Sequence, residues 1–328
     1  MAKLIVVGAS AGGVRALQRL AAGLPADLRA AVLVVLHIGS HRSMLPEMLS
    51  SRGPLPAAHA RHEEPLQPGR IYVAPPDHHM VVSGGTVRLN RGPKEHHTRP
   101  AIDPLFLSAA LSHGSETIGV VLTGTLDDGT FGLQAIKQCG GTALVQDPAD
   151  AEEPSMPESA LHHVDVDHCV PLADMARLLT SLAAAPSRAS ASAPADRLQH
   201  EQALTLFEGD AMEHLTAVAT PSPFVCPDCH GGLWEINESS PPRYRCHVGH
   251  GYTLRTLQHA MTDTADEAVW NALRALHEKS LLLERMIDFH EAGGDSQQAN
   301  ALAISAERLN AQCEQLRRLV EKTPEPIE

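Results

Sequence analysis

Short apolar runs alternate with helix-like segments over the first 183 residues of the chain. Apolar runs bounded by turn residues are typical of buried strands, whereas the segments between them have the periodicity of amphipathic helices. The predicted strands are Leu4–Val7, Ala31–Leu36, Arg70–Val73, Thr117–Leu122, Thr142–Val145 and the shorter His168–Val170. The predicted helices include Val14–Leu24, Met44–Ser51, Ile102–Leu111 and Gly129–Cys139. This alternation predicts an α/β fold with a doubly wound, mostly parallel sheet.

Residues 80–89, with the sequence MVVSGGTVRL, have a different pattern. Two short strand-like runs flank Ser83, Gly84 and Gly85. Glycines between two apolar runs favour a tight hairpin turn. We therefore expect a local antiparallel hairpin at this point of the domain.

The apolar pattern ends near residue 184, where a stretch rich in Ala, Ser and Pro begins. Such a composition without apolar periodicity is typical of a linker. We therefore expect a first domain over residues 1–185 and a linker over residues 186–200. A second region over residues 201–262 should contain a short helix, at roughly 201–217, and a cysteine-bearing module at 222–252.

Residues 263–322 repeat apolar positions at heptad-like spacing on both sides of Gly293-Gly294. This pattern predicts a helical hairpin. Thr264 and Glu267 have the spacing of a capping box for the first helix, and Asp295 or Ser296 can cap the second. Packing of the two helices on each other explains the pattern, and the sequence leaves open whether a partner's helix joins them.

The net charge of −13 and the pI near 5.8 argue against a general nucleic-acid-binding protein. Apolar runs such as Ala30–Leu36 are too short to span a bilayer, so we expect no membrane insertion. The N-terminus enters a predicted strand directly, without the regions of a signal peptide. We therefore expect a cytoplasmic protein, in which the clustering of Cys226, Cys229 and Cys246 indicates a metal site before a disulfide.

The first predicted strand runs into Gly8-Ala9-Ser10-Ala11-Gly12, which has the form G-x-S-x-G. At a strand-to-helix turn this motif exposes a nucleophilic serine, and the N–H of the next residue, Ala11, can face a developing oxyanion. A dinucleotide-binding turn would need glycine at the position of Ser10, and a phosphate-binding loop would need Lys-Ser/Thr where Val14-Arg15 follow Gly13. A plain turn with a capping serine is the remaining alternative.

A serine nucleophile needs a base and an orienting acid. His37 ends the strand 31–36, and Asp127 and Asp128 follow the strand 117–122. Because the carboxyl ends of parallel strands meet at one edge of the sheet, these groups should lie near Ser10. Each residue by itself fits a capping or core histidine or a turn aspartate. Their conjunction with the serine motif favours catalysis.

The motifs of residues 1–183 resemble those of the catalytic domain of the bacterial chemotaxis protein-glutamate methylesterases, the CheB family. They are Gly8-Ala9-Ser10-Ala11-Gly12-Gly13, Leu36-His37-Ile38, Tyr72-Val73-Ala74-Pro75-Pro76-Asp77-His78-His79-Met80, Arg99-Pro100-Ala101-Ile102-Asp103-Pro104-Leu105-Phe106, Leu122-Thr123-Gly124 through Asp128-Gly129, Gln146-Asp147-Pro148 and Ser155-Met156-Pro157. The resemblance implies a Ser10–His37–Asp128 triad that hydrolyses glutamate γ-methyl esters on chemoreceptor helices. Many members also deamidate receptor glutamines.

Two positions depart from the family pattern. Ala11 stands where threonine is common, and Thr125-Leu126 stand where Met-Gly is common. The resemblance implies that the N–H of Thr125 helps that of Ala11 to bind the oxyanion, while Leu126 can alter the loop. Arg99 is a candidate for steering an acidic receptor surface, with a structural ion pair as the alternative.

Familiar members of the family carry an N-terminal receiver domain whose phosphorylation relieves inhibition. Only nine residues precede Ser10, whereas a receiver needs roughly a hundred. We therefore expect no receiver domain and an active site that is open by default. Gating would then come from the C-terminal region or from a separate partner.

Cys226-Pro227-Asp228-Cys229 is followed by Cys246-His247-Val248-Gly249-His250. A C-x-x-C pair with a later Cys/His pair suits a closed tetrahedral zinc site. We expect Cys226, Cys229, Cys246 and His250 as the ligands of one structural zinc, with His247 as the alternative fourth ligand. Free buried cysteines are the structural alternative.

The sequence thus favours a protein-glutamate methylesterase, and also allows a protein-glutamine deamidase. It predicts no cofactor for catalysis. The expected partners are methyl-accepting receptor helices, and a further partner can dock on the helical hairpin. The alternatives are a non-catalytic interaction protein on the same fold and an esterase for another substrate.

Overall fold

The computed structural model describes residues 3–38, 42–186 and 196–321 of the chain. The chain divides into two compact units, residues 1–257 and residues 258–328. The first unit contains an α/β domain and the cysteine-bearing region, and the second is helical.

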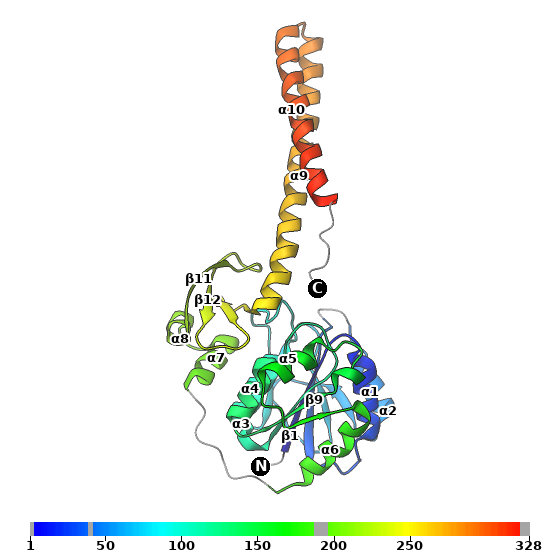
Figure 1. Cartoon of the computed structure of the whole chain (residues 1–328). Helices are drawn as coiled ribbons and strands as arrows, with labels where there is room; N and C mark the ends of the chain where they lie inside the picture. The colour runs from blue at the N-terminus through cyan, green and yellow to red at the C-terminus, as the bar shows by residue number, and fades with distance from the viewer. Residues whose placement is uncertain (1–2, 39–41, 187–195, 322–328) are drawn as a thin grey trace. The chain divides into compact units, whose positions relative to one another are not determined.

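Seven parallel strands form the central sheet of the first unit (Figure 1). Their order across the sheet is β10 (His168–Val170), β9 (Thr142–Gln146), β8 (Thr117–Val121), β1 (Lys3–Ala9), β2 (Ala30–Leu36), β5 (Ile71–Val73) and β3 (Ala57–His59). The six predicted strands are confirmed. The pattern does not predict β3, because its residues Ala-Ala-His form no apolar run and are only half-buried at the sheet edge.

The side chains of β1 alternate between two apolar cores. Leu4 and Val6 lie in one core, and Ile5 and Val7 lie in the other. Three helices of the α/β domain contribute to the first core, together with Leu198 from beyond the domain: α3 (Ile102–His113), α4 (Thr130–Gln138) and α5 (Ser155–His163). Three more complete the second: α1 (Gly13–Gly23), α2 (Leu45–Arg52) and α6 (Leu172–Ala184). Helices therefore cover both faces of the sheet, which confirms the doubly wound architecture.

A small antiparallel sheet lies beside the parallel one. Its strands, in order, are β4 (Glu64–Pro65), β7 (Thr86–Asn90) and β6 (His79–Ser83). The domain also contains the 3₁₀ turns η1 (Gly114–Glu116) and η2 (Pro148–Asp150), which lie outside this sheet. Gly84 and Gly85 both have positive φ angles, of 57° and 80°, as a tight two-residue hairpin requires. The predicted hairpin at 80–89 is therefore confirmed.

The cysteine-bearing region begins with two helices, α7 (Asp196–Leu206) and α8 (Ala211–Val218). A four-stranded antiparallel sheet follows, built from β11 (Ala219–Val225), β12 (Gly232–Ile236), β13 (Arg243–Cys246) and β14 (Gly251–Thr253). We call this sheet, residues 219–253, the cysteine module. Two boundaries differ from expectation: α7 begins inside the expected linker, and the module lies in the same compact unit as the α/β domain. Linker residues 187–195 lie outside the described residues.

Buried ion pairs join the cysteine module to the elements beside it. The carboxylate of Glu201, on α7, lies 2.6 Å from Nη2 of Arg243, on β13. The guanidinium of Arg243 also lies 3.4 Å from the ring centre of Phe131, on α4. Arg245, on β13, pairs with Glu95 of the α/β domain, and both side chains are about 95% buried. Because buried charges are costly unless paired, these contacts hold the module in one position on the domain.

Helix α9 (Leu254–Ala292) begins directly after β14, and α10 (Ser296–Glu321) follows it. The predicted helical hairpin is confirmed, but its predicted first capping box is wrong because α9 runs through Thr264 without interruption. The side chains of Thr253 and Thr256 cap α9 instead: Thr253 Oγ1 accepts from the Thr256 N–H, and Thr256 Oγ1 accepts from the Thr253 N–H. Asp295 caps α10 by accepting from the N–H of Gln298 at 3.1 Å.

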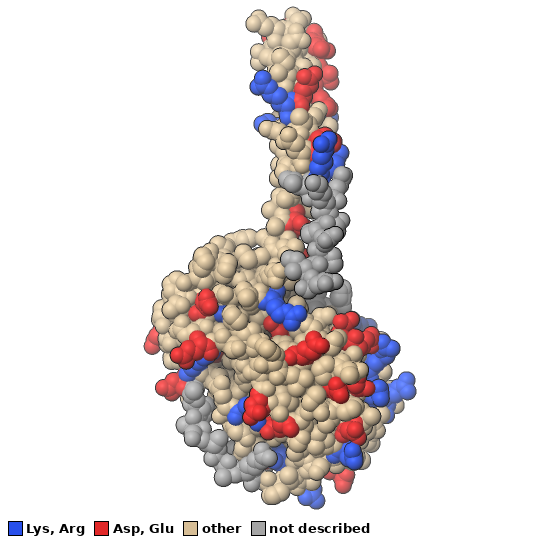
Figure 2. Space-filling model, viewed as in Figure 1, with Lys and Arg blue, Asp and Glu red and all other residues tan. Residues whose placement is uncertain are grey.

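Among the residues that the structure describes, no helix combines the length and apolar character needed to cross a membrane. On the face shown in Figure 2, acidic side chains are interspersed with basic ones.

Candidate active site

Ser10, His37 and Asp128 meet at the carboxyl edge of the parallel sheet. Ser10 directly follows β1, His37 directly follows β2, and Asp128 lies on the loop after β8, and these three strands are adjacent. Ser10 Oγ lies 3.2 Å from His37 Nδ1, and His37 Nε2 lies 2.7 Å from Asp128 Oδ2. A proton on Nε2 can be donated to the carboxylate, which leaves Nδ1 free to accept the serine proton. We call these three residues the Ser-His-Asp group.

The turn at Ser10 is held by its backbone. The Ser10 N–H donates to the carbonyl of Thr123 at 3.0 Å, and the Gly13 N–H donates to the carbonyl of Ser10 at 2.8 Å. Gly12 has a φ of 73°, and a Cβ on it would lie 2.8 Å from the Cβ of Glu152. Only glycine fits this turn without strain, which is the physical reason for the last glycine of the motif.

Asp128 is buried and bonded through both of its oxygens. Oδ2 accepts from the N–H of Ile102 at 2.7 Å, and Oδ1 accepts from the N–H of Asp103 at 3.0 Å, both in the first turn of α3. Burial works to raise the pKa of this carboxyl, but the charge on His96, the hydrogen bond from His37 and the Ile102 amide outweigh burial and hold the pKa well below its usual value. The carboxylate is therefore ionised and fixed in orientation.

Asp127 occupies a different place from its neighbour. Its Oδ1 accepts from the hydroxyl of Thr253 at 2.8 Å, and burial raises its pKa. Its Oδ2 is buried without a hydrogen-bond partner among the described residues. Of the two adjacent acids, it is Asp128 that the structure brings to His37.

The expected oxyanion donors are the N–H groups of Ala11 and Thr125, and both residues are exposed. Hydrogen bonds of Thr123 connect the loops on which they lie. Thr123 Oγ1 donates to the carbonyl of Ala11 at 3.0 Å and accepts from the Glu153 N–H at 2.8 Å. Leu126, at the position where glycine is common in the family, has a φ of 65°. A non-glycine residue in this left-handed region carries strain, so the departure from the pattern has a local cost.

Arg99 is engaged in an ion pair. Its Nε and Nη2 donate to Asp77 Oδ1 at 2.9 and 2.7 Å, and its Nη1 donates to the carbonyl of Gly92. The hydrogen bond from Arg99 lowers the pKa of Asp77. Arg99 therefore has the geometry of a structural ion pair, the alternative given above. A role for Arg99 in steering the substrate stays a prediction.

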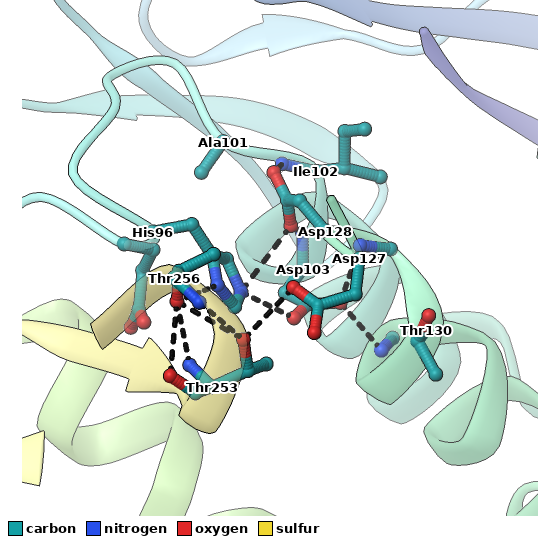
Figure 3. A network of polar contacts seen from close by, with 12 residues as sticks. His96, Ala101, Ile102, Asp103, Asp127, Asp128, Thr130, Thr253 and Thr256 are labelled. Atoms are coloured by element: carbon teal, nitrogen blue, oxygen red, sulfur yellow. Dashed lines mark hydrogen bonds and ion pairs between the residues drawn. The ribbon is translucent and has the colours of Figure 1, made fainter. Parts of the chain in front are cut away.

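Two residues beneath Asp128 are missed by sequence reasoning (Figure 3). Asp103 Oδ1 accepts from the N–H groups of Gly129 and Gly132 at 3.0 and 2.7 Å, and its Oδ2 accepts from His96 Nε2 at 2.9 Å. Asp103 belongs to the family motif that begins at Arg99, so a signal for it was present. His96 lies in a polar loop sequence, Lys-Glu-His-His-Thr, that carries no such signal.

The side chains of Cys226, Cys229, Cys246 and His250 converge in the cysteine module. Cys229 Sγ lies 3.6 Å from Cys246 Sγ, and His250 Nδ1 lies 3.7 Å from Cys226 Sγ and 3.6 Å from Cys246 Sγ. Zinc–sulfur bonds of about 2.3 Å at tetrahedral angles place two sulfurs about 3.8 Å apart, and a disulfide would need about 2.05 Å. The separations therefore fit four ligands around one ion.

The cluster takes His250 rather than His247 as its histidine. The backbone turns tightly at both ends of the cluster: the Cys226 N–H donates to the carbonyl of Gly231 at 2.8 Å, and the Cys246 N–H donates to that of His250 at 3.0 Å. Three thiols and one imidazole complete a tetrahedral shell, which leaves no position for a reacting molecule.

The α/β domain of the chain is similar to known proteins. Residues 5–179, more than half of the chain, match the family model described as CheB methylesterase. An Anaeromyxobacter dehalogenans protein named protein-glutamate methylesterase/protein-glutamine glutaminase 2 is 39% identical over 181 residues, which cover 55% of this chain and 53% of that protein. A Leptospira interrogans relative is 36% identical over 183 residues, which cover 54% of this chain and 93% of the relative.

The crystal structure of the Thermotoga maritima CheB methylesterase catalytic domain aligns with a TM-score of 0.54 and 32% identity, covering 56% of this chain and 99% of that domain. The chain thus spans about half the length of the Anaeromyxobacter relative and nearly all of the Leptospira one. The match to the family model ends before α7, so the cysteine module lies outside it.

Proposed function

Because the chain belongs to the CheB methylesterase family, we propose that it hydrolyses glutamate γ-methyl esters on chemoreceptor-like proteins. The observation that carries the proposal is the Ser-His-Asp group, in which Ser10, His37 and Asp128 are joined by contacts of 3.2 and 2.7 Å.

In the proposed mechanism, Ser10 Oγ attacks the ester carbonyl while His37 Nδ1 takes its proton. Asp128 holds the ring through Nε2 and stabilises the imidazolium that forms. The carbonyl oxygen becomes an oxyanion, which the N–H groups of Ala11 and Thr125 receive. The C–OCH₃ bond then breaks, and methanol leaves with the proton from His37. Water, deprotonated by His37, attacks the acyl-enzyme and releases the glutamate carboxylate and Ser10.

The same acyl-enzyme would form from a glutamine side chain, with ammonia as the leaving group. The printed name of the Anaeromyxobacter relative includes a glutaminase, which supports extending the proposal to deamidation. The substrate is a receptor helix that presents Glu or Gln at its surface, and the reaction takes place in the cytoplasm, where the six free cysteines stay reduced.

The proposal gives the cysteine module one structural zinc ion, held by Cys226, Cys229, Cys246 and His250. The mutual distances of 3.6–3.7 Å and the closed donor set support this assignment. The ion would stabilise the fold of the module and take no part in the hydrolysis. The helical hairpin offers exposed apolar side chains, among them Trp270, Leu282 and Phe289, as a surface for a helical partner.

The test is methanol release from a methylated chemoreceptor preparation by the full chain. Ser10→Ala should lower the rate by about 10³-fold or more, because the nucleophile of a triad acts as a unit with its base. His37→Gln should have a similar effect, whereas Ser51→Ala, on an exposed serine, should leave the rate unchanged. Turnover by Ser10→Ala at the wild-type rate would contradict the assignment.

A fluorophosphonate probe separates the two alternatives. A wild-type chain that releases no methanol but is labelled at Ser10 would be an esterase for another substrate. A wild-type chain that does neither would be an interaction protein on the same fold.

A further inference from the structure

His96 lies beneath Asp128, on a segment that the reaction does not use directly. Its side chain is only 4% exposed, and its Nε2 lies 3.5 Å from Asp128 Oδ1 and 2.9 Å from Asp103 Oδ2. His37 approaches the other oxygen of Asp128. The carboxylate of the Ser-His-Asp group is therefore contacted by two histidines, the partly exposed His37 and the buried His96.

The carboxylates around His96 explain why a positively charged side chain is needed there. Asp103, Asp127 and Asp128 are each less than 5% exposed and lie around the same imidazole (Figure 3). Burial alone would lower the pKa of His96, but the carboxylates of Asp128 and Asp103, with Asp127, raise it to about 9. Near neutral pH His96 is thus a buried cation that offsets carboxylates which would otherwise repel one another.

The junction of β14 and α9, residues 253–256, also contacts this cluster. The hydroxyl of Thr253 donates to Asp127 Oδ1 at 2.8 Å. Thr256 Oγ1 lies 3.0 Å from Thr253 Oγ1 and 3.4 Å from His96 Nδ1. These two hydroxyls are the same ones that cap α9. The side chains of Thr253 and Thr256 therefore both cap α9 and contact Asp127 and His96.

The backbone of the His96 segment is also held by the cysteine module. The His96 N–H donates to the carbonyl of Gly251, on β14, at 2.8 Å, and the Gly251 N–H donates to the carbonyl of Lys94 at 3.2 Å. His96 itself has a φ of 53°, which is strained for a residue with a side chain and needs support from its surroundings. That support comes from β14, which lies only one residue after the cluster histidine His250.

We propose that His96 is a positioning residue for Asp128, and that the junction of β14 and α9 at the end of the cysteine module, residues 253–256, holds it there, so that the folding of the module sets the reactivity of Ser10. This inference rests on the proposed function. It gives the region beyond the family match a defined task, which is to complete the support of an active site that lies in the α/β domain.

The test measures two quantities on the full chain: the rate at which a fluorophosphonate labels Ser10, and kcat and KM for methanol release. His96→Gln should lower the labelling rate and kcat by about tenfold or more, with KM little changed, because a displaced acid misorients the base. Thr253→Val should lower both rates in the same way, while Thr253→Ser, which keeps the hydroxyl, should restore them. Thr117→Val is the matched control, because it removes a buried hydroxyl at the opposite end of β8.

The outcomes separate the inference from the proposed function. Wild-type labelling and kcat in both His96→Gln and Thr253→Val would overturn the inference and leave the proposed function standing. Equal losses in Thr253→Val, Thr253→Ser and Thr117→Val would also overturn it, since the effect would then be general destabilisation. A wild-type chain that neither reacts with the probe nor releases methanol would instead remove the proposed function, and the inference with it.

Discussion

The α/β domain and the cysteine module hold their folds together by different means. The domain has two large apolar cores, one on each face of the parallel sheet, filled by side chains from the strands and from the helices that cover each face. The module, by contrast, shares a smaller apolar cluster with α7 and α8, formed by Leu204, Leu215, Val218, Ala219 and Ile236. Polar contacts also hold the module: the Cys/His cluster and the buried ion pairs of Arg243 and Arg245.

This difference predicts under which conditions the fold of each region should be stable. Apolar burial depends little on metal or redox state, so the domain should keep its fold when the metal is removed. Thiols, carboxylates and imidazoles change with pH, metal and redox state, so the module should respond to all three. Breaking the buried polar contacts should therefore change stability more than relieving backbone strain in the α/β domain.

Metal removal should have the largest effect. Chelation, or Cys226→Ser, should unfold residues 222–252, since a zinc site contributes on the order of 10 kcal/mol to folding a module of this kind. Hydrogen exchange should then rise sharply in the module while the amides of β1, β2 and β8 stay protected. Cys169→Ser, at an exposed free cysteine, is the control. Purified protein without zinc, or a module that stays protected after chelation, would contradict the proposed site.

Breaking the buried pair of Glu201 and Arg243 comes next. Glu201→Gln should lower the free energy of unfolding by about 3–5 kcal/mol, because it leaves Arg243 buried without its partner. The matched control is Glu208→Gln, whose pair with Arg88 is about half exposed and should be worth less than about 1 kcal/mol. Denaturant titration of the two variants measures the difference. Equal losses would mean that burial does not distinguish the two pairs.

The titration of His96 should appear as a dependence of stability on pH. The folded pKa is raised from 6.5 to about 9, so the stability that its charge contributes is fully present below pH 6.5 and is lost as the pH rises to about 9. The advantage of wild type over His96→Gln should therefore shrink over this range by on the order of 3 kcal/mol. Denaturant titrations at several pH values measure it. A constant difference between the two proteins would show that His96 is neutral in the folded chain.

The smallest effect is expected within the α/β domain. Leu126→Gly should stabilise the protein by up to about 1 kcal/mol, because glycine adopts a φ of 65° without strain. Leu126→Ala keeps a Cβ and should keep the strain, so the comparison of these two variants by thermal unfolding isolates the backbone term. If both variants lose stability equally, the side chain of Leu126 contributes more by its contacts than its backbone costs.

Elements that rest on local patterns were predictable from the sequence, whereas contacts between distant residues were not. Six strands, the hairpin at 80–89 and the two C-terminal helices were predictable because each rests on a local pattern of apolar residues and glycines. The start of α9 was not predictable from Thr264, because Thr253 and Thr256 cap the helix instead. The hydroxyl of Thr253 also bonds Asp127, which is far away in the sequence. The ion pair of Arg99 with Asp77 likewise depends on two loops whose approach no local pattern encodes.

The sequence by itself determined the chemistry at the sheet edge. Gly8 to Gly12 encode the turn, and strand ends place Ser10, His37 and the Asp127-Asp128 pair at one edge, since parallel strands share their direction. Spacing along the chain left both acids open, the family resemblance pointed to Asp128, and the structure brings Asp128 to His37. Only the tertiary structure decided that His96, Asp103 and Thr253 lie close to these acids. Such contacts join residues up to 126 positions apart, and buried polar groups find partners by the packing of whole elements rather than by spacing along the chain.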